Sequence, residues 1–148
     1  MNTTRSHGFQ FLDFLFMEEQ EIHQFETIAG SFAVIKCGGK NLMVYNKWHE
    51  QWELPAGRRE GGETSKECAV RELYEESGQL VEDLEFKGLL KLQHTETREI
   101  KYNPVFLGTV EKLQPFIPNA ETTEMKLWDT KEDIGVLDEM DIKILDYI

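Results

Sequence analysis

The sequence predicts an α+β domain, in which two helices cover a mixed or antiparallel β-sheet. Three observations indicate this class. The length of 148 residues suits one domain with its own core. Apolar runs with strand character lie on both sides of a helical segment, and a second helical pattern follows near the C-terminus. We therefore expect residues 1–148 to form a single domain.

Composition limits the classes of function. The formal net charge of −12 repels a nucleic-acid duplex, and no basic stripe offsets it. Cys37 and Cys68 stand in no disulfide or metal-binding pattern, which is typical of reduced, cytoplasmic proteins. The most apolar stretch, residues 9–17, is too short to span a bilayer and lacks the features of a signal peptide. We expect a cytoplasmic protein that binds neither duplex nor membrane.

Strands are predicted for most of the N-terminal part. Residues 9–17, FQFLDFLFM, are expected to form a buried strand, and the polar residues 18–26 a connection or a short extra strand. Residues 28–36 and 41–47 are apolar runs around a Gly-Gly turn, which predicts a β-hairpin. Residues 48–62 contain a proline and three glycines, which predict a structured loop.

The central helix is predicted from signals at both of its ends. Thr64 followed by Glu67 is a capping-box pattern, in which two side chains satisfy free backbone N–H groups. Gly78 is the residue expected just after a helix ends. The helix should therefore span residues 64–77.

The remaining elements complete the order of strands, helix, strands and helix. Residues 84–93, 98–112 and 124–130 are expected to be strands. Pro104 lies within the second of these and indicates an edge position or a bulge, because proline has no N–H for a sheet. Apolar residues from 137 to 148 recur at helical spacing, which predicts a C-terminal helix.

The central helix carries an unusual load of like charge. Residues 57–79 read GRREGGETSKECAVRELYEESGQ and contain six glutamates. Glu72, Glu75 and Glu76 share one face at spacings where they repel one another, near the helix end that disfavours anions. Such a run usually marks a solvated face. The glycine-rich loop before the helix favours another interpretation, a site for Mg²⁺ or Mn²⁺ that binds the phosphates of a substrate.

A metal site of this kind suggests hydrolysis of a phosphate ester or anhydride. The cation polarises phosphoryl oxygens and lowers the pKa of a bound water, while a carboxylate takes a proton from the attacking water. Arg71 is expected to pair with Glu63 in the loop. A surface pair with Glu75 or Glu67 is the alternative.

These residues resemble the Nudix box, G-x5-E-x7-R-E-U-x-E-E-x-G-U, in which U is aliphatic. The matching positions are Gly57, Glu63, Arg71, Glu72, Leu73, Glu75, Glu76 and Gly78. Gln79 departs from the box at its last position, which concerns packing after the helix and not catalysis. The flanking segments WELPAG, residues 52–57, and ETTE, residues 121–124, are also similar to that family.

The resemblance implies an α/β/α sandwich with a mixed sheet between helices. It also implies hydrolysis, with Mg²⁺ or Mn²⁺, of a nucleoside diphosphate linked to another moiety. Glu72, Glu75 and Glu76 match the metal-binding glutamates of the family, and the main-chain carbonyl of Ala56 matches a further ligand.

The same resemblance assigns supporting roles. Glu63 and Arg71 are expected to orient the loop and the helix. Glu121 or Glu124 is expected to supply a distal ligand or the general base, a role that a glutamate of the box can also fill. The number of metal ions stays open.

Four residues are candidates for substrate contacts. Trp48 and Trp52 precede the loop, where an aromatic ring can stack on a purine for about 1–3 kcal/mol. Trp52 alternates with Leu54, which favours a core position instead. Phe32 is a candidate for a base pocket, with the core as the alternative, and Arg58 is expected at the substrate.

The substrate class is less constrained. The proline and the tyrosine that mark ADP-ribose and dinucleoside-polyphosphate branches beyond the box are absent. We expect a nucleoside triphosphate pyrophosphatase for oxidised purine nucleotides such as 8-oxo-dGTP, with ADP-ribose or a nucleotide sugar as the alternative. A non-catalytic ligand-binding module is disfavoured because the REUxEE core is intact. The partner is then a small-molecule nucleotide, bound by a monomer or a homodimer.

Overall fold

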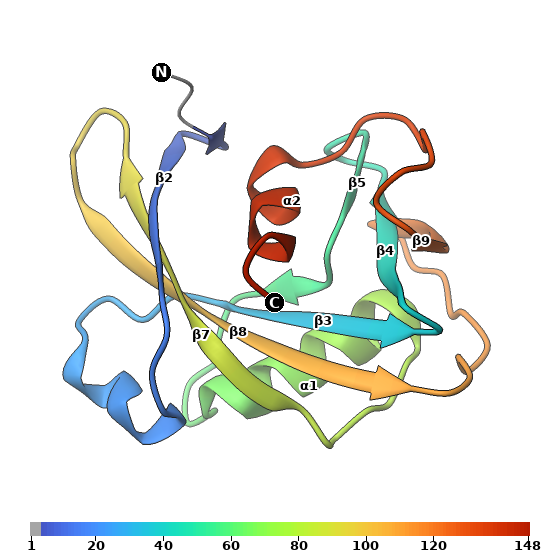
Figure 1. Cartoon of the computed structure of the whole chain (residues 1–148), viewed down its shortest axis with the longest axis horizontal. Helices are drawn as coiled ribbons and strands as arrows, with labels where there is room; N and C mark the ends of the chain where they lie inside the picture. The colour runs from blue at the N-terminus through green and yellow to red at the C-terminus, as the bar shows by residue number, and fades with distance from the viewer. Residues whose placement is uncertain (1–3) are drawn as a thin grey trace.

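The computed structural model describes residues 4–148 and contains nine strands, two α-helices and one 3-10 helix in that range. The strands are β1 (Arg5–Ser6), β2 (Phe9–Leu15), β3 (Ser31–Cys37), β4 (Lys40–Asn46), β5 (Gln51–Glu53), β6 (Ala56–Gly57), β7 (Glu85–His94), β8 (Ile100–Val110) and β9 (Thr122–Trp128). The helices are η1 (Glu19–Gln24), α1 (Ser65–Ser77) and α2 (Glu139–Leu145). Figure 1 shows their arrangement.

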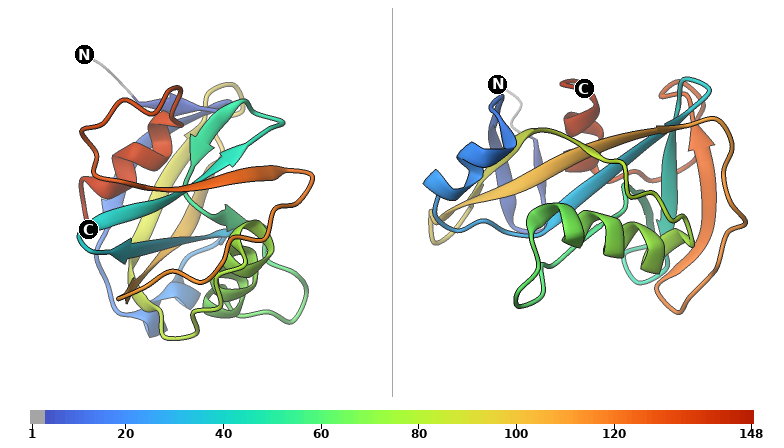
Figure 2. Two further views of the ribbon diagram at one scale, coloured as in Figure 1. Left: turned by 90° about the vertical axis from the view of Figure 1, so that its right-hand side faces the viewer. Right: turned by 90° about the horizontal axis from the view of Figure 1, so that it is seen from below.

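The strands form one mixed sheet in the order β1-β2-β7-β8-β3-β4-β5, with β6 beside β3 and β9 beside β4. Strands β3 and β8 run parallel, with Phe32 opposite Val105, and the other neighbouring strands of the described chain run antiparallel. Helices α1 and α2 cover opposite faces of the sheet (Figure 2). The predicted α/β/α sandwich with a mixed sheet is confirmed.

Each face of the sheet has its own core, because side chains alternate along β3. Ala33 and Ile35 pack toward α1, where Leu73 is fully buried. Val34 packs on the other face, toward Ile144 of α2. Full burial of a leucine side chain contributes roughly 1.5–3 kcal/mol relative to exposure. Helix α1 is therefore stabilised mainly by the burial of its apolar face.

Helix α1 begins and ends as predicted. Thr64 Oγ1 accepts a hydrogen bond from the Glu67 N–H (3.1 Å), and Glu67 Oε1 accepts one from the Thr64 N–H (2.8 Å), which completes the capping box. Gly78 adopts a left-handed conformation (φ 79°) and donates its N–H to Tyr74 O. An added Cβ there would lie 2.6 Å from Ile117, so glycine is required for space as well as for conformation.

The hairpin of β3 and β4 is confirmed, but its strands diverge. They pair only next to the turn, at Lys36 with Asn41 and at Cys37 with Lys40. Strand β5 then pairs with β4, and β6 pairs with β3. The predicted loop of residues 48–62 therefore contains two short strands, which place the loop between the arms of the hairpin.

One expectation about the N-terminal part needs correction. Residues 9–17 contain strand β2, but only Phe14 of that strand is buried, and Phe16 beyond it is 67% exposed. The reason is that only the two-residue β1 lies outside β2. Residues 18–26 form the connection that was the first of the two alternatives, and it contains the 3-10 helix η1 in place of the extra strand.

Pro104 was expected at an edge or a bulge, and the edge position is wrong. Strand β8 lies between β7 and β3. Proline is tolerated there because the parallel pairing with β3 begins one residue later, at Val105. Before that point the side-chain amide of Asn103 donates to Gly30 O (2.6 Å). The bulge lies on β7, between Phe86 and Gly88.

The C-terminal helix is shorter than the apolar spacing predicted. Helix α2 begins after Asp138, whose carboxylate accepts the N–H groups of Met140 and Asp141. Across residues 4–148, no helix combines the length and apolar character that crossing a bilayer requires.

Candidate active site

The loop of residues 54–63 packs directly on α1. A Cβ added to Gly57 would lie 2.1 Å from Cδ of Glu72, so the Glu72 carboxylate occupies the space that any other residue would need. Glu76 lies one turn further along α1, and its Oε1 accepts the Ala56 N–H (2.9 Å). The loop backbone thus binds the Glu76 carboxylate at Ala56, and the Glu72 carboxylate lies against Gly57.

Arg71 links the loop to the helix. Its guanidinium donates to both oxygens of Glu63 (2.6 and 3.1 Å) and to the Arg58 carbonyl (2.7 Å). It also donates to Glu72 (2.7 Å) and Glu75 (3.0 Å). The predicted pair with Glu63 is therefore present, and the alternative pair with Glu75 forms as well. The hydrogen bonds from Arg71 lower the pKa of Glu63, and the negative charge of Glu63 stabilises the Arg71 guanidinium in return.

The carboxylates of Glu72 and Glu76, which we call the inner carboxylates, lie in an unfavourable environment for negative charge. Burial raises the pKa of Glu76 well above its ordinary value against the opposing effect of the Ala56 N–H, and the charges of Glu72 and Glu121 raise it further. Burial also raises the pKa of Glu72, although Arg71 opposes it. A divalent cation would compensate these charges, and oxygen donors are the ligands that Mg²⁺ and Mn²⁺ prefer. The donor set therefore fits the expected metal.

The distal glutamates differ in position. Asn46 Nδ2 donates to Glu121 (3.0 Å) and to Glu53 (3.1 Å). The charge of Glu121 also helps to raise the pKa of Glu72 and of Glu76, so Glu121 lies near both carboxylates. Glu124 is exposed on β9, opposite Tyr45. Its neighbour Met125 packs toward α1, so Glu124 projects to the other face of the sheet. The structure brings Glu121 to the cluster and leaves Glu124 outside it.

A cavity of about 720 Å³ adjoins this cluster. Ala56 and Gly57 form one wall, and the predicted contacts Phe32 and Arg58 also line it. The lining includes two further cations, Arg59 and Lys101, in a chain of net charge −12. Burial lowers the pKa of Lys101, and the charge of Arg58 adds to this effect. The cavity therefore offers cationic groups beside a carboxylate cluster.

The two tryptophans lie elsewhere. Trp52 is 8% exposed and packs edge-on against Tyr45, so it is a core residue, as its alternation with Leu54 indicated. Trp48 is 66% exposed and does not line the cavity. Trp52 therefore takes the core alternative, and a substrate contact of the exposed Trp48 stays a prediction.

Sequence reasoning missed Glu53, Arg59 and Lys101. Glu53 lies in the WELPAG segment, so the flanking similarity was an available signal. Lys101 lies on β8, and only the sheet order brings it to the cavity.

Gln79, the one departure from the box, is buried without loss of hydrogen bonds. It is 2% exposed, donates to Gln114 O and accepts from Gln114 N (both 2.8 Å). The polar side chain thus replaces aliphatic packing with a two-bond link to the segment before β9.

The chain is similar to known proteins in sequence and in fold. The model for the NUDIX domain family matches residues 27–147. A Bacillus subtilis (strain 168) protein provisionally named 8-oxo-dGTP diphosphatase YtkD is 30% identical over 91 residues, and the match covers 62% of this chain and 56% of that protein. The match thus spans little more than half the length of this relative.

Solved structures share the fold. The Bacillus subtilis pyrophosphohydrolase BsRppH has a TM-score of 0.74 at 20% identity, with 99% of this chain and 92% of that chain covered. A MutT NUDIX hydrolase from Burkholderia pseudomallei has a TM-score of 0.69 at 19% identity, with 80% and 95% covered. At such identities the likeness concerns the fold alone.

Proposed function

The chain belongs to the NUDIX domain family, and from this premise we propose that it is a pyrophosphohydrolase that acts on nucleoside triphosphates, with oxidised purine nucleotides such as 8-oxo-dGTP as the first candidates. One observation carries the proposal: the carboxylates of the buried Glu76 and the half-buried Glu72 adjoin, through Ala56 and Gly57, a cavity that contains Arg58, Arg59 and Lys101. Such a cavity suits a polyphosphate chain bound next to a divalent cation.

The proposed roles follow from these contacts. Glu72, Glu75, Glu76 and the Ala56 carbonyl would hold Mg²⁺ or Mn²⁺. When bound, the cation polarises the phosphoryl oxygens and lowers the pKa of a water molecule. Arg71 positions the cluster by joining Glu63, the Arg58 carbonyl and Glu72.

We assign the distal role, as a further ligand or as the general base, to Glu121 rather than Glu124. Asn46 fixes the Glu121 carboxylate, and its charge acts on both inner glutamates. Glu121→Gln should therefore lower kcat by about 10²- to 10⁴-fold, the usual contribution of an acid or base. Glu124→Gln should have a far smaller effect. Equal losses in the two variants would contradict the assignment.

The decisive experiment is a panel assay with Mg²⁺ or Mn²⁺. The panel contains ordinary and 8-oxo nucleoside triphosphates, ADP-ribose and a nucleotide sugar, and the readout is released pyrophosphate, phosphate or nucleoside monophosphate. We expect the highest kcat/KM among the triphosphates. A preference for ADP-ribose or the nucleotide sugar would show that the proposed substrate is wrong. If no compound were turned over, the proposal that the protein is a hydrolase would fail.

Glu76→Gln tests the site itself. It keeps an oxygen to accept the Ala56 N–H but removes a charge of the cluster, so turnover should fall by orders of magnitude while the thermal unfolding curve stays cooperative. Glu96→Gln, in an exposed turn, is the matched control and should keep the parental rate. An active Glu76→Gln variant would place the metal elsewhere.

A further inference from the structure

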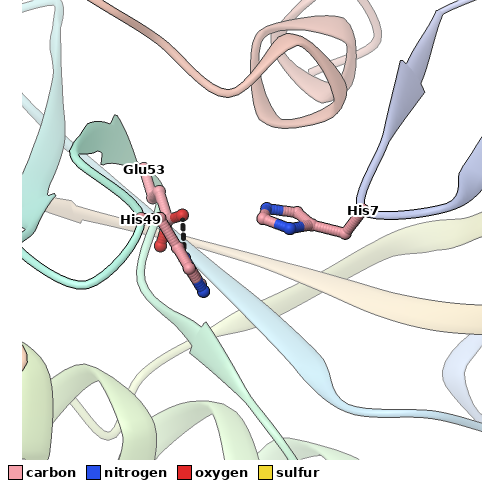
Figure 3. A group of neighbouring side chains, drawn as sticks. All are labelled: His7, His49 and Glu53. Carbon is pink, nitrogen blue, oxygen red and sulfur yellow. Dashed lines mark hydrogen bonds and ion pairs between the residues drawn. The ribbon is translucent and has the colours of Figure 1, made fainter.

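We propose a second metal site, formed by His7, His49 and Glu53, that binds a divalent transition metal ion of the Zn²⁺ type. One potential ligand atom from each side chain lies within 4.8 Å of the others. Figure 3 shows the His7 ring pointing toward Glu53 and His49 from the opposite side. The three residues come from the turn between β1 and β2, the turn between β4 and β5, and β5 itself.

The donor set differs from that of the carboxylates on α1. Two imidazoles and a carboxylate suit Zn²⁺ and related ions, whereas Mg²⁺ prefers oxygen ligands alone. Three protein ligands also leave one coordination position open, as in zinc sites that bind water or a substrate. His7 and His49 line the cavity of about 720 Å³ together with Arg58. The open position would therefore face the same space as the proposed substrate.

The carboxylate of the group is held in place by its neighbours. Glu53 is 14% exposed, and its Oε1 accepts from Asn46 Nδ2 (3.1 Å). Its Oε2 accepts from Gln51 Nε2 and lies within hydrogen-bond distance of His49 Nδ1 (both 2.7 Å). Residues that orient metal ligands in this way typically support affinity by about 10- to 100-fold.

His7 has a similar support on the other side. Its Nε2 lies 3.2 Å from Asp138 Oδ2, a side chain that is 5% exposed. The Asp138 carboxylate is itself fixed by Ser6 Oγ (2.8 Å) and by backbone N–H groups of α2. The imidazole ring is thus oriented by a buried group, although 53% of its own side chain is open to solvent and to an entering ion.

Simple ion pairs account for only part of this arrangement. His49 with Glu53 and His7 with Asp138 each form a pair. These pairs do not explain why two imidazole rings converge to a centroid distance of 4.7 Å, at which two protonated rings repel each other. A bound cation requires both rings to be neutral and draws both nitrogens toward one point, which agrees with the observed convergence.

The test measures Zn²⁺ binding directly. The parent in this experiment is the protein with Glu72→Gln and Glu76→Gln, in which the carboxylates of α1 do not capture the ion. Mg²⁺ is present in excess. Isothermal titration should show one equivalent of Zn²⁺, and Co²⁺ in its place should give the visible absorption of a four-coordinate ion. His7→Ala or His49→Ala should weaken Zn²⁺ binding at least 100-fold, because losing a ligand exceeds the effect of losing its support.

His23→Ala is the matched control, since His23 is exposed on η1 outside the group, and it should bind Zn²⁺ as the parent does. Thermal unfolding provides a second readout: Zn²⁺ should raise Tm in the parent and not in the His7 and His49 variants. The proposal fails if the parent binds no Zn²⁺, or if His7→Ala and His49→Ala bind it as tightly as His23→Ala. Because binding is measured without turnover, neither result depends on the proposed substrate.

Discussion

At the scale of single residues, the geometry of the site depends on a glycine without a side chain as much as on the positions of charged groups. Gly57 has no Cβ, and the Glu72 carboxylate fills the vacant space. Arg71 then holds this carboxylate and the loop carbonyl of Arg58 with one planar group. A residue with no side chain and a residue with five donors therefore determine how close the carboxylates come to the loop.

Gly57→Ala tests the importance of this contact. The new Cβ would meet Cδ of Glu72 at 2.1 Å, so the carboxylate must move away from the loop. We expect kcat/KM for the preferred nucleotide to fall by about 10²-fold, the scale of a loss from misplacement by roughly 1 Å. Gly61→Ala is the control, because a Cβ there meets no atom within 4 Å. Equal activity of the two variants would show that the close approach is dispensable.

At the scale of the element, α1 combines good caps with a poor charge distribution. Glu72, Glu75 and Glu76 repel one another by some tenths of a kcal/mol per pair and stand near the negative end of the helix dipole. The capping box at Thr64, the left-handed Gly78 and the buried apolar face offset this repulsion. A helix that serves a site in this way relies on its ends and its packing.

Thr64→Ala removes the N-terminal cap. The Glu67 N–H loses its partner, and the free energy of unfolding should fall by about 1 kcal/mol, the usual value for a cap. Thr64→Ser keeps the hydroxyl and should lie within a few tenths of a kcal/mol of the parent. Urea denaturation at constant Mg²⁺ measures both changes. A loss in the serine variant equal to that in the alanine variant would assign the effect to the methyl group instead.

At the scale of the whole molecule, both α1 and α2 contact the segment that leads into the loop of the candidate active site. Residues 136–138 pair with Trp52, and the Asp141 carboxylate accepts the Leu54 N–H (2.8 Å). Asp141 is buried, and this burial raises its pKa well above the ordinary value, with the charge of Asp138 adding to the effect. Helix α2 thus fixes the backbone just before Pro55 through a carboxyl group that favours its protonated form.

This environment predicts a pH dependence with a definite sign. Between the ordinary pKa of aspartate and the raised pKa in the folded state, the folded protein binds one proton more than the unfolded chain. The free energy of unfolding should therefore fall as pH rises through this window, by at most about 1.4 kcal/mol per pH unit, and then level off.

Asp141→Asn removes this titration and retains an oxygen for the Leu54 N–H. The stability of the variant relative to the parent should increase across the same pH window, as measured by urea denaturation at several pH values. Asp146→Asn, on an exposed side chain at the end of the same helix, is the control and should show no such trend. A constant difference between Asp141→Asn and the parent would exclude the proposed protonation.

Local patterns were sufficient where neighbours along the chain decide the outcome. The capping box and Gly78 predicted α1, the Gly-Gly turn predicted the hairpin, and the box placed Glu63 and Arg71 at spacings that meet in space. The edge position expected for Pro104 was wrong, because the place of β8 in the sheet depends on strands from other parts of the chain.

The sequence by itself determined the fold class, the family and the helix that carries the carboxylates, since each follows from patterns among residues close together in the chain. Only the tertiary structure decided which distant groups join that helix. The order of the strands brings Lys101 of β8 to the cavity, and the N-terminal turn brings His7 close to His49. The path of the chain into β9 puts Glu121 near Glu72 and Glu76 and leaves Glu124 on the other face of the sheet. These meetings depend on strand pairing and loop path, which no local spacing encodes.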